Sequence, residues 1–404
     1  MGAPARLARQ GDAAALEQAL QDSRRDTLAT FATYEAALPG LQVPQRDELN
    51  LPLWELGHIG WFQSWWLARF PLRTQGVDAE PDAPRRAPAR SDADHLYNSS
   101  RVPHDIRWQL PLPDAAATRA DLQQQLDETG ALLARLPVDG ADDRRLYFFR
   151  LALLHEDMHH EAALYMAQAL AITIADPRWR PTPLLLPPPA LHQAPGRWWL
   201  GSPADAGFAF DNELGAHEVE LPAVQIDAQA VRWAEFLPFI EAGGYREERW
   251  WTPAGRAWVA SSGARAPRYL QHDGGTWLQW RHGRWQALPT DEAACHLTQH
   301  EALAWCRWAG RRLPTEAEWE RAAVTTGPAF RWGDVWEWTA SAFAAYPGFR
   351  AHPYRDYSAP WFDGRPVLRG ASFMTQPRLR HPRYRNYFPP GRNDVPAGFR
   401  SCAA

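Results

Sequence analysis

The pattern of hydrophobic and polar positions predicts helices in the first 170 residues. These predicted helices span residues 13–38, 54–69, 115–136 and 141–171. In the second of them, Trp54, His58, Trp61 and Trp65 fall at i, i+4, i+7 and i+11, on one helix face. The third begins directly after Asp114, a residue type that caps helix N-termini well. Four long helices predict a four-helix bundle, with the long connection 71–112 folded over its mouth.

The pattern changes at a proline-rich stretch, residues 177–196 (PRWRPTPLLLPPPALHQAPG). Proline fixes φ and has no N–H, so no regular helix or central strand is expected there. We predict a bundle domain over 1–176, a linker over 177–196 and a second domain over 197–404. Short alternating segments and Gly, Pro and Asp turns favour an α+β fold for the second domain. Its predicted helices begin after Val231 and at two capping boxes, Thr298 with Glu301 and Thr315 with Glu318.

Composition excludes several classes of enzyme. All 43 basic residues are arginine, and a chain without lysine cannot form a Schiff base or a phosphate-binding P-loop. A net charge of −4 argues against nucleic-acid binding. No apolar stretch is long enough for a membrane span, and the N-terminus lacks the apolar core of a signal peptide. Three cysteines in 404 residues favour a reducing, cytoplasmic location.

The segment LLHEDMHHEAALY provides the clearest chemical signal. His155 and His159 lie four residues apart, so both rings project from one helix face, as two ligands of one metal ion do. The same segment matches the HExxH zinc-protease signature, with Glu156 as base. A metzincin continuation would need Gly and His where the chain has Ala162 and Tyr165, so we disfavour a protease.

His58 is the best candidate for a third ligand. Alone, a histidine among tryptophans is more simply a core residue. Within a bundle, however, His58 can lie opposite His155 and His159. Three imidazoles on one side of a metal leave positions open for a substrate and for dioxygen or water.

The ordered motifs of the chain resemble the ergothioneine-type sulfoxide synthases from about residue 15 to residue 402. These enzymes are non-haem iron enzymes that join a chalcogen donor to hercynine (trimethylhistidine) with O₂. The resemblance lies in GHxxWF around His58, in HExxHxE from His155, and in C-terminal strings. Those strings are RRLPTEAEWERAA (311–323), VWEWTAS (335–341), YPGFR (346–350), VLRGASF (367–373), RYRNYFPPG (383–391) and AGFRSC (397–402).

The resemblance implies a DinB-like four-helix bundle followed by a C-type-lectin-like α+β domain, as in formylglycine-generating enzymes. It also implies Fe(II) on His58, His155 and His159, O₂ as co-substrate, and a substrate cleft between the two domains. Tyr387 takes a position near the trimethylammonium group, and an aromatic face suits a quaternary cation. Simple packing of Tyr387 is an equally good explanation. Its neighbour Asn386 joins the expected substrate contacts.

Two departures from the family pattern bear on the chalcogen donor. Phe388 replaces an aspartate found in members that use γ-glutamylcysteine, and Met158 replaces a common glutamine. These departures make the chain similar to the selenoneine synthase branch, whose donor is a selenosugar.

Several polar residues are candidates for other roles in this reaction. The loop 97–108 (YNSSRVPHDIRW) offers polar groups for a sugar, with Arg101 and Arg107 as candidate contacts, although each is more simply a loop-stabilising residue. Tyr346 is the candidate for managing protons or electrons beside the oxygen intermediate. The arginines Arg378, Arg380, Arg383 and Arg385 are more simply a solvated strand face with acidic partners, although one of them can hold the carboxylate of hercynine.

Other functions remain as alternatives. A sulfoxide synthase acting on cysteine or another thiol is the nearest. A DinB-type thiol S-transferase needs no second domain, so the C-terminal half of the chain argues against it. A non-catalytic lectin-like module needs no metal ligands, so the three histidines argue against that function. Cys295 and Cys306 do not form the paired reactive thiols of a formylglycine-generating enzyme and are expected to be buried hydrophobes.

Overall fold

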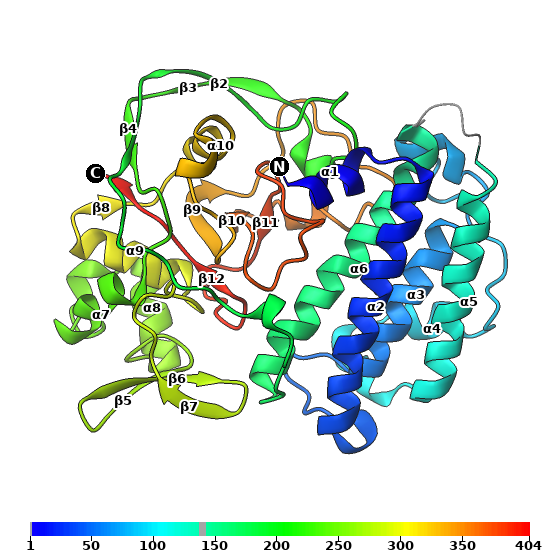
Figure 1. Ribbon diagram of the computed structural model, residues 1–404, viewed down its shortest axis with the longest axis horizontal. Coiled ribbons are helices and arrows are strands. Elements are labelled where there is room, and N and C mark those ends of the chain that lie inside the picture. The colour runs from blue at the N-terminus through cyan, green and yellow to red at the C-terminus, as the bar shows by residue number, and fades with distance from the viewer. Residues whose placement is uncertain (1, 137–142) are drawn as a thin grey trace.

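The computed structural model describes residues 2–136 and 143–404 and contains a helix bundle beside a mixed α+β domain (Figure 1). The bundle helices are α1 (Ala3–Gln10), α2 (Ala13–Ala37), α3 (Pro52–Trp66), α5 (Ala115–Leu133) and α6 (Asp143–Ala169). The short helix α4 (Ala93–Tyr97) lies in the connection between α3 and α5. The four predicted long helices are therefore present, although residues 141–142 of the predicted fourth helix lie outside the described residues.

The helix ends follow local chemistry. Asp114 accepts a hydrogen bond from the Ala117 N–H, as predicted for the cap of α5. Pro52 occupies the first turn of α3, where no N–H is needed. The α3 helix ends at Trp66 instead of residue 69, because the chain turns there and brings Leu67 and Phe70 into the core.

The connection 71–112 lies along the bundle and touches the second domain. It packs on α3 and α6, and its acidic residues pair with arginines of the second domain. Arg350 Nη2 lies 2.8 Å from an Asp78 oxygen, and Arg355 Nη1 lies 2.9 Å from an Asp82 oxygen. The contacts between this connection and the second domain therefore include ion pairs at an exposed surface.

The second domain is built on two four-stranded sheets. One sheet has the order β11-β10-β9-β12 and the other β1-β4-β13-β8, with β2–β3 and β5–β6–β7 as smaller sheets. Strands β9 and β10 are antiparallel, and β12 runs parallel to β9. The strands are β1 (Leu191–Gln193), β2 (Gly196–Leu200), β3 (His217–Leu221), β4 (Val224–Ile226), β5 (Leu270–Asp273), β6 (Thr276–Arg281), β7 (Arg284–Ala287), β8 (Arg311–Arg312), β9 (Trp336–Ala342), β10 (Pro366–Gly370), β11 (Asn386–Tyr387), β12 (Ala397–Gly398) and β13 (Cys402–Ala403).

Four helices accompany these strands. They are α7 (Trp233–Glu241), α8 (Pro253–Ser262), α9 (Gln299–Trp308) and α10 (Glu316–Thr325). Both predicted capping boxes are present, at Thr298 for α9 and at Thr315 for α10. The proline-rich stretch 177–196 contains β1, which pairs only with β4 at a sheet edge, where proline neighbours are tolerated.

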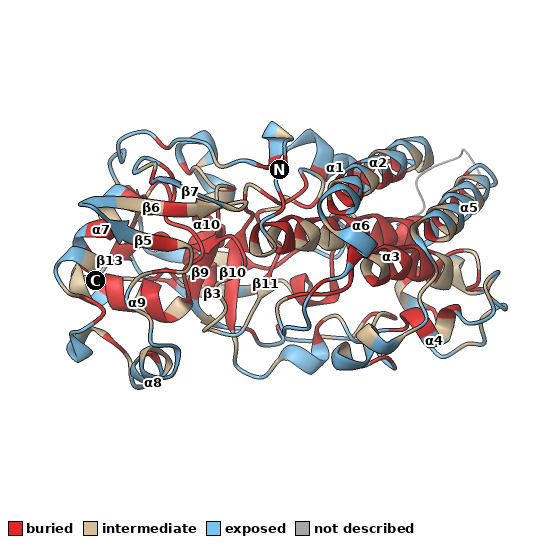
Figure 2. Cartoon of the chain, turned by 90° about the horizontal axis from the view of Figure 1, so that it is seen from below, coloured by how far each residue is buried: buried red, intermediate tan, exposed pale blue. Residues whose placement is uncertain are grey.

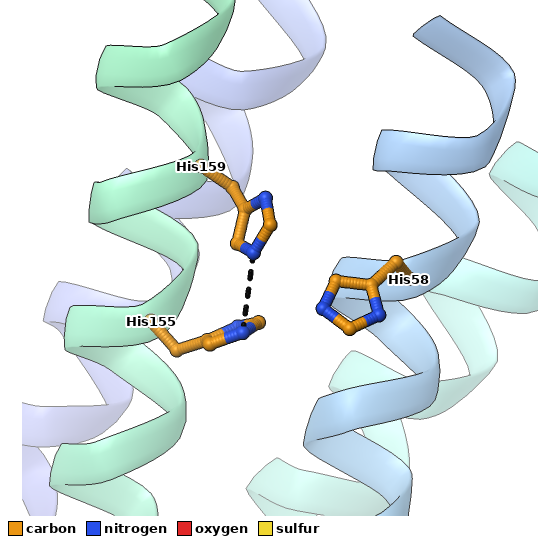
Figure 3. A group of neighbouring side chains, drawn as sticks. All are labelled: His58, His155 and His159. Atoms are coloured by element: carbon orange, nitrogen blue, oxygen red, sulfur yellow. Dashed lines mark hydrogen bonds between the residues drawn. The ribbon is translucent and has the colours of Figure 1, made fainter. Parts of the chain in front are cut away.

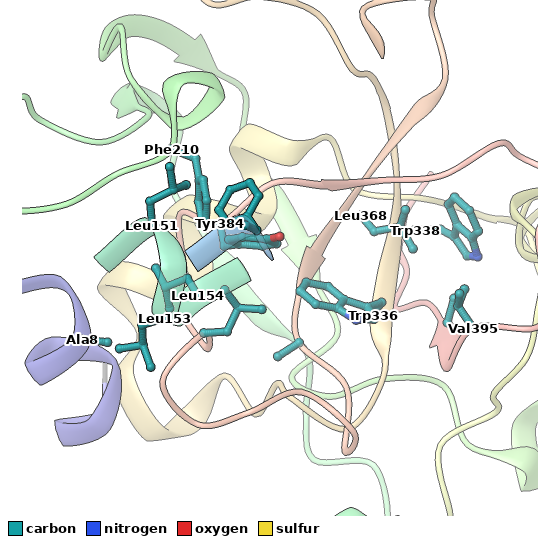
Figure 4. Close-up of a cluster of buried hydrophobic side chains, with 14 of the residues drawn as sticks. Ala8, Leu151, Leu153, Leu154, Phe210, Trp336, Trp338, Leu368, Tyr384 and Val395 are labelled. Carbon is teal, nitrogen blue, oxygen red and sulfur yellow. The ribbon is translucent and has the colours of Figure 1, made fainter. Parts of the chain in front are cut away.

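One hydrophobic core crosses from the bundle into the second domain. Leu151, Leu153 and Leu154 of α6 share a buried cluster with Trp336 of β9 and Leu368 of β10 (Figure 4). Figure 2 shows the buried residues running from α3 and α6 into β9 and β10. The two parts therefore pack as a continuous body, and α6 is the element that joins them.

No helix in the described ranges 2–136 and 143–404 has the length and hydropathy of a membrane span.

Arg24 provides a test of the packing of α2 against α6, because its side chain is buried and its Nε lies 2.9 Å from Glu156 of α6. Replacing it by methionine leaves the Glu156 carboxylate without its cation, so we expect R24M to lower the free energy of unfolding by about 3–5 kcal/mol. The neighbouring Arg25 pairs with Asp22 at the surface, so R25M is the control and should cost less than about 1 kcal/mol. Equal losses in urea denaturation of the two variants would contradict the assigned role of Arg24.

Candidate metal centre

Three histidines converge between α3 and α6. His58 projects from α3, and His155 and His159 project from successive turns of α6 (Figure 3). One nitrogen from each ring lies within 4.8 Å of the others. The Nε2 atoms of His155 and His159 are 3.2 Å apart. The predicted grouping of these three residues is therefore present, and its spacing suits three ligands of one ion.

Hydrogen bonds fix the orientation of two of the rings. His58 Nδ1 lies 2.8 Å from the Tyr97 carbonyl oxygen, and a carbonyl only accepts, so Nδ1 carries the proton. His159 Nδ1 lies 2.5 Å from Glu55 Oε2. Both contacts leave Nε2 free to bind a metal, in the arrangement that commonly orients ligand histidines. Glu55 is itself held by a hydrogen bond from the Asn50 amide.

Aromatic side chains pack against the faces of two of the rings. The Trp54 ring stacks on His58 with centroids 4.7 Å apart, and Phe62 stacks on His155 at 3.5 Å and an interplanar angle of 4°. The tryptophan-rich face predicted from the sequence therefore packs directly on a ligand candidate. Such packing limits the rotamers of the two imidazoles and excludes water from their faces.

Burial keeps the imidazoles of His58 and His155 neutral. Burial, with the nearby charge of His159, lowers the pKa of His58 to about 3 and holds the pKa of His155 well below its usual value. Burial acts to raise the pKa of Glu55, but the charge of His159 and its hydrogen bond prevail and lower that pKa to about 2. Neutral imidazoles beside a carboxylate are the form that binds a metal ion, because ligands must be deprotonated.

Glu156, the glutamate of the HExxH pattern, is not free to act as a base. Glu156 is buried and accepts hydrogen bonds from Arg24, whose Nη2 also donates to Gln63 Oε1 at 2.6 Å. A protease base must reach a water molecule on the metal. The position of Glu156 in a buried ion pair therefore agrees with our rejection of the protease interpretation.

A cavity of about 260 Å³ opens beside His159, between α6 and the second domain. Five predicted site residues line it: Met158, His159, Asn386, Tyr387 and Phe388. The remaining walls are mostly aromatic or apolar, and they include Tyr165, Trp336, Tyr357, Leu379 and Tyr384. Among the described lining residues, Glu161 is the sole carboxylate, and it accepts hydrogen bonds from Trp336, Ser372 and Thr375. The cavity therefore offers aromatic faces and few charges.

Met158 lies at the centre of a tyrosine cluster. Its sulfur is 3.4 Å from the Tyr384 hydroxyl and 3.8 Å from the Tyr357 hydroxyl, and these two hydroxyls are 3.0 Å apart. The Tyr387 hydroxyl donates to the Tyr357 carbonyl, and its ring stacks on Phe343 at 4.0 Å. These contacts hold in place the part of the cavity wall that Met158 and the three tyrosines form.

Tyr346 lies elsewhere. Its hydroxyl donates to Glu316 at 3.1 Å, the Arg385 guanidinium lies 3.9 Å from its ring centre, and it is not among the residues that line the cavity. Tyr354, which the sequence analysis did not single out, lies much nearer to the histidines. Its ring centre is 6.1 Å from that of His155 and 5.0 Å from that of Phe62. The string AHPYRDYS contains this tyrosine, but no spacing in the sequence distinguishes it.

The candidate arginines of the loop 97–108 also lie outside the cavity. Arg101 is exposed, whereas Arg107 is half-buried with its guanidinium 3.6 Å from the centre of the Trp54 ring. Since Trp54 stacks on His58, Arg107 lies two rings away from the metal centre. The loop therefore packs behind α3 in this structure.

The arginines of the stretch 378–385 are engaged within the protein. Arg378 Nη2 lies 2.8 Å from Asp157, and Arg385 Nε lies 3.0 Å from Glu316. Arg380 donates to the Ser372 and Thr375 carbonyls. None of the arginines of this stretch lines the cavity, so the structure gives no support to the idea that one of them holds a substrate carboxylate.

The cysteines are free and buried, as expected. Burial raises the pKa of Cys295 and of Cys402 to about 12, so neither thiol is reactive near neutral pH.

Comparisons with known proteins agree with both halves of this architecture. Residues 191–334 match the sulfatase-modifying factor enzyme 1-like domain family, which confirms the predicted type of the second domain. The chain is 34% identical to the formylglycine-generating enzyme of Streptomyces coelicolor, but only over 34% of its own length and 48% of that protein.

Longer matches cover both domains. The chain is 33% identical to the hercynine oxygenase of Mycolicibacterium thermoresistibile, over 96% of this chain and 94% of that one. It is 32% identical to the hercynine oxygenase of Mycobacterium tuberculosis, over 88% of this chain and 92% of that one. The chain therefore belongs to the hercynine oxygenase family of ergothioneine-type sulfoxide synthases.

Proposed function

We propose that this enzyme uses Fe(II) and O₂ to form a carbon–selenium bond between hercynine and a selenosugar. The single observation that carries the proposal is three converging imidazoles beside a cavity with aromatic walls and few charges. Bound Fe(II) would supply the oxygen chemistry and the affinity for a soft chalcogen. His58, His155 and His159 would hold it, and Glu55 would keep His159 in its metal-binding tautomer.

The cavity suits the two ends of hercynine. Tyr384, Tyr387 and Trp336 offer aromatic faces to a quaternary ammonium group. Asn386 accepts the Tyr387 N–H through Oδ1 at 2.8 Å, so its amide N–H groups are available to a substrate carboxylate. No arginine lies among the described lining residues, so the amide is the best donor present.

The walls also favour a donor without an ammonium group. Phe388 lies where family members that use γ-glutamylcysteine carry an aspartate. The Arg392 guanidinium lies 4.5 Å from the centre of the Phe388 ring. A ligand ammonium would find no free carboxylate at that position, because Phe388 is apolar and Arg392 is itself paired with Asp394. Hydroxyls of a sugar can instead reach Asn386 and the tyrosine hydroxyls. A thiol such as cysteine is the second candidate, because it presents the same soft chalcogen.

Turnover tests the proposal directly. The protein is reconstituted with Fe(II) without oxygen and then given O₂, hercynine and a selenosugar, cysteine or γ-glutamylcysteine. We expect the selenosugar to give a product with the mass of a hercynine–selenium adduct, at the highest rate of the three. A faster reaction with cysteine would assign the sulfur chemistry instead. Equal turnover with zinc, or turnover without O₂ consumption, would exclude the oxidative function.

Removing one imidazole tests the metal assignment. We expect H159A to lose stoichiometric Fe(II) binding and activity, because two ligands hold the ion much less well than three. Metal content after anaerobic loading and desalting measures this loss. H192A, which changes an exposed histidine of β1, is the matched control and should retain both. Unchanged iron content in H159A would show that the metal binds elsewhere.

Position 388 tests donor choice. We expect F388D to gain turnover with γ-glutamylcysteine, because a carboxylate there can pair with the donor's ammonium group. F388L removes the ring without adding charge and should not gain it. The ratio of kcat/KM for the two donors is the measurement. The role of Phe388 is contradicted if F388D leaves that ratio equal to the ratio of the wild-type enzyme.

A further inference from the structure

A second, much smaller cavity lies inside the bundle, on another side of His159. It has a volume of about 30 Å³ and is lined by residues of α2, α3 and α6. Its lining residues are Thr27, Phe31, Tyr34, Pro52, Glu55, Leu56, Ile59, His159, His160, Ala163 and Met166. His159 also lines the cavity of about 260 Å³ between α6 and the second domain, which is the substrate cavity under the proposed function. This one residue therefore borders both spaces.

The polar groups around the small cavity already have partners. The Tyr34 hydroxyl donates to the Ala163 carbonyl at 2.5 Å, and Glu55 bonds to His159. His160 is bonded through both ring nitrogens, to Thr30 and to Gln376. Of the lining side chains described, Thr27 alone keeps a buried oxygen without a partner.

This shortage of partners argues against water. A buried water molecule usually makes about three hydrogen bonds, and apolar cavities of this kind stay dry and take up gases such as xenon. The lining here offers one free hydroxyl among the side chains of Phe31, Leu56, Ile59 and Met166. The space is large enough for a diatomic molecule and has the surface chemistry for a nonpolar one.

The substrate cavity leaves little space for such a molecule. Its volume of about 260 Å³ is below the usual range for a site that holds one drug-sized ligand. Under the proposed function it must admit both hercynine and a chalcogen donor. A third reactant therefore benefits from a separate position next to the metal ligands.

We propose that the small cavity is a dioxygen site, which supplies O₂ to the metal centre from the bundle side of His159. The cavity would raise the local concentration of a nonpolar gas while the substrates occupy the other side. This inference rests on the proposed function for the identity of the gas, whereas the capacity to bind a nonpolar atom does not depend on it.

Xenon tests the cavity independently of turnover. Crystals of the wild-type protein under xenon pressure should show an anomalous peak among Phe31, Ile59 and Ala163. A163L fills the space and should abolish the peak, with A163V as a milder variant. T27V keeps the volume and removes the free hydroxyl, so it should retain the xenon. Ordered water in place of xenon in the wild-type cavity would overturn the proposal.

Oxygen kinetics test the role in the reaction. We expect A163L to lower kcat/KM for O₂ by at least about threefold, with the KM for hercynine unchanged. A131L, a matched substitution at an exposed position on α5, should leave both parameters at the wild-type values. An unchanged O₂ dependence in A163L would overturn the proposal.

The two proposals fail in distinguishable ways. Oxygen consumption by the wild-type enzyme without xenon binding would remove the dioxygen site and keep the proposed function. Xenon binding without any oxygen consumption would remove the proposed function, and with it the assignment of the cavity to O₂.

Discussion

The structure depends on the packing of α6 against α2, α3 and the second domain at once. One face of this helix presents His155 and His159 to His58 of α3, and its other faces meet α2 and the second domain. The polar residues between the two ligands and just beyond them are all bonded to other elements. These contacts join Glu156 to Arg24, Asp157 to Arg378, His160 to Gln376 and Glu161 to Trp336. Because each contact is buried, the helix has little freedom to rotate or slide, and the ligand geometry follows from the fold.

The same arrangement explains how a chain with arginine as its sole basic residue type can have a cavity with few charges. The arginines near the site are used in ion pairs and carbonyl contacts within the protein. Arg378 joins the second domain to α6, and Arg385 makes its contacts within the second domain. Guanidinium groups suit this role because they make several hydrogen bonds in a fixed plane. Recognition inside the cavity is then left to aromatic faces, one thioether and one amide. Under the proposed function, these groups would favour a quaternary cation and hydroxyls over a donor ammonium group.

Much of this could be predicted from the sequence. The helical periodicity located the bundle, the capping boxes located α9 and α10, and the i, i+4 spacing brought His155 and His159 to one face. The grouping with His58 followed from the bundle itself. The tyrosine near the metal could not be predicted, because Tyr354 reaches the histidines through a loop whose course depends on long-range packing. Acidic partners were expected for the arginines of 378–385, but the sequence does not reveal that the partners of Arg378 and Arg385 are Asp157 and Glu316.

Diffraction at the iron absorption edge tests the central claim most directly. Crystals of the Fe(II)-loaded enzyme soaked with hercynine under anaerobic conditions should show one anomalous peak, within bonding distance of the Nε2 atoms of His58, His155 and His159. The trimethylammonium group should lie against Tyr384 and Tyr387. An iron peak away from these three nitrogens would contradict the account, and so would hercynine bound anywhere other than in the cavity that Met158 lines.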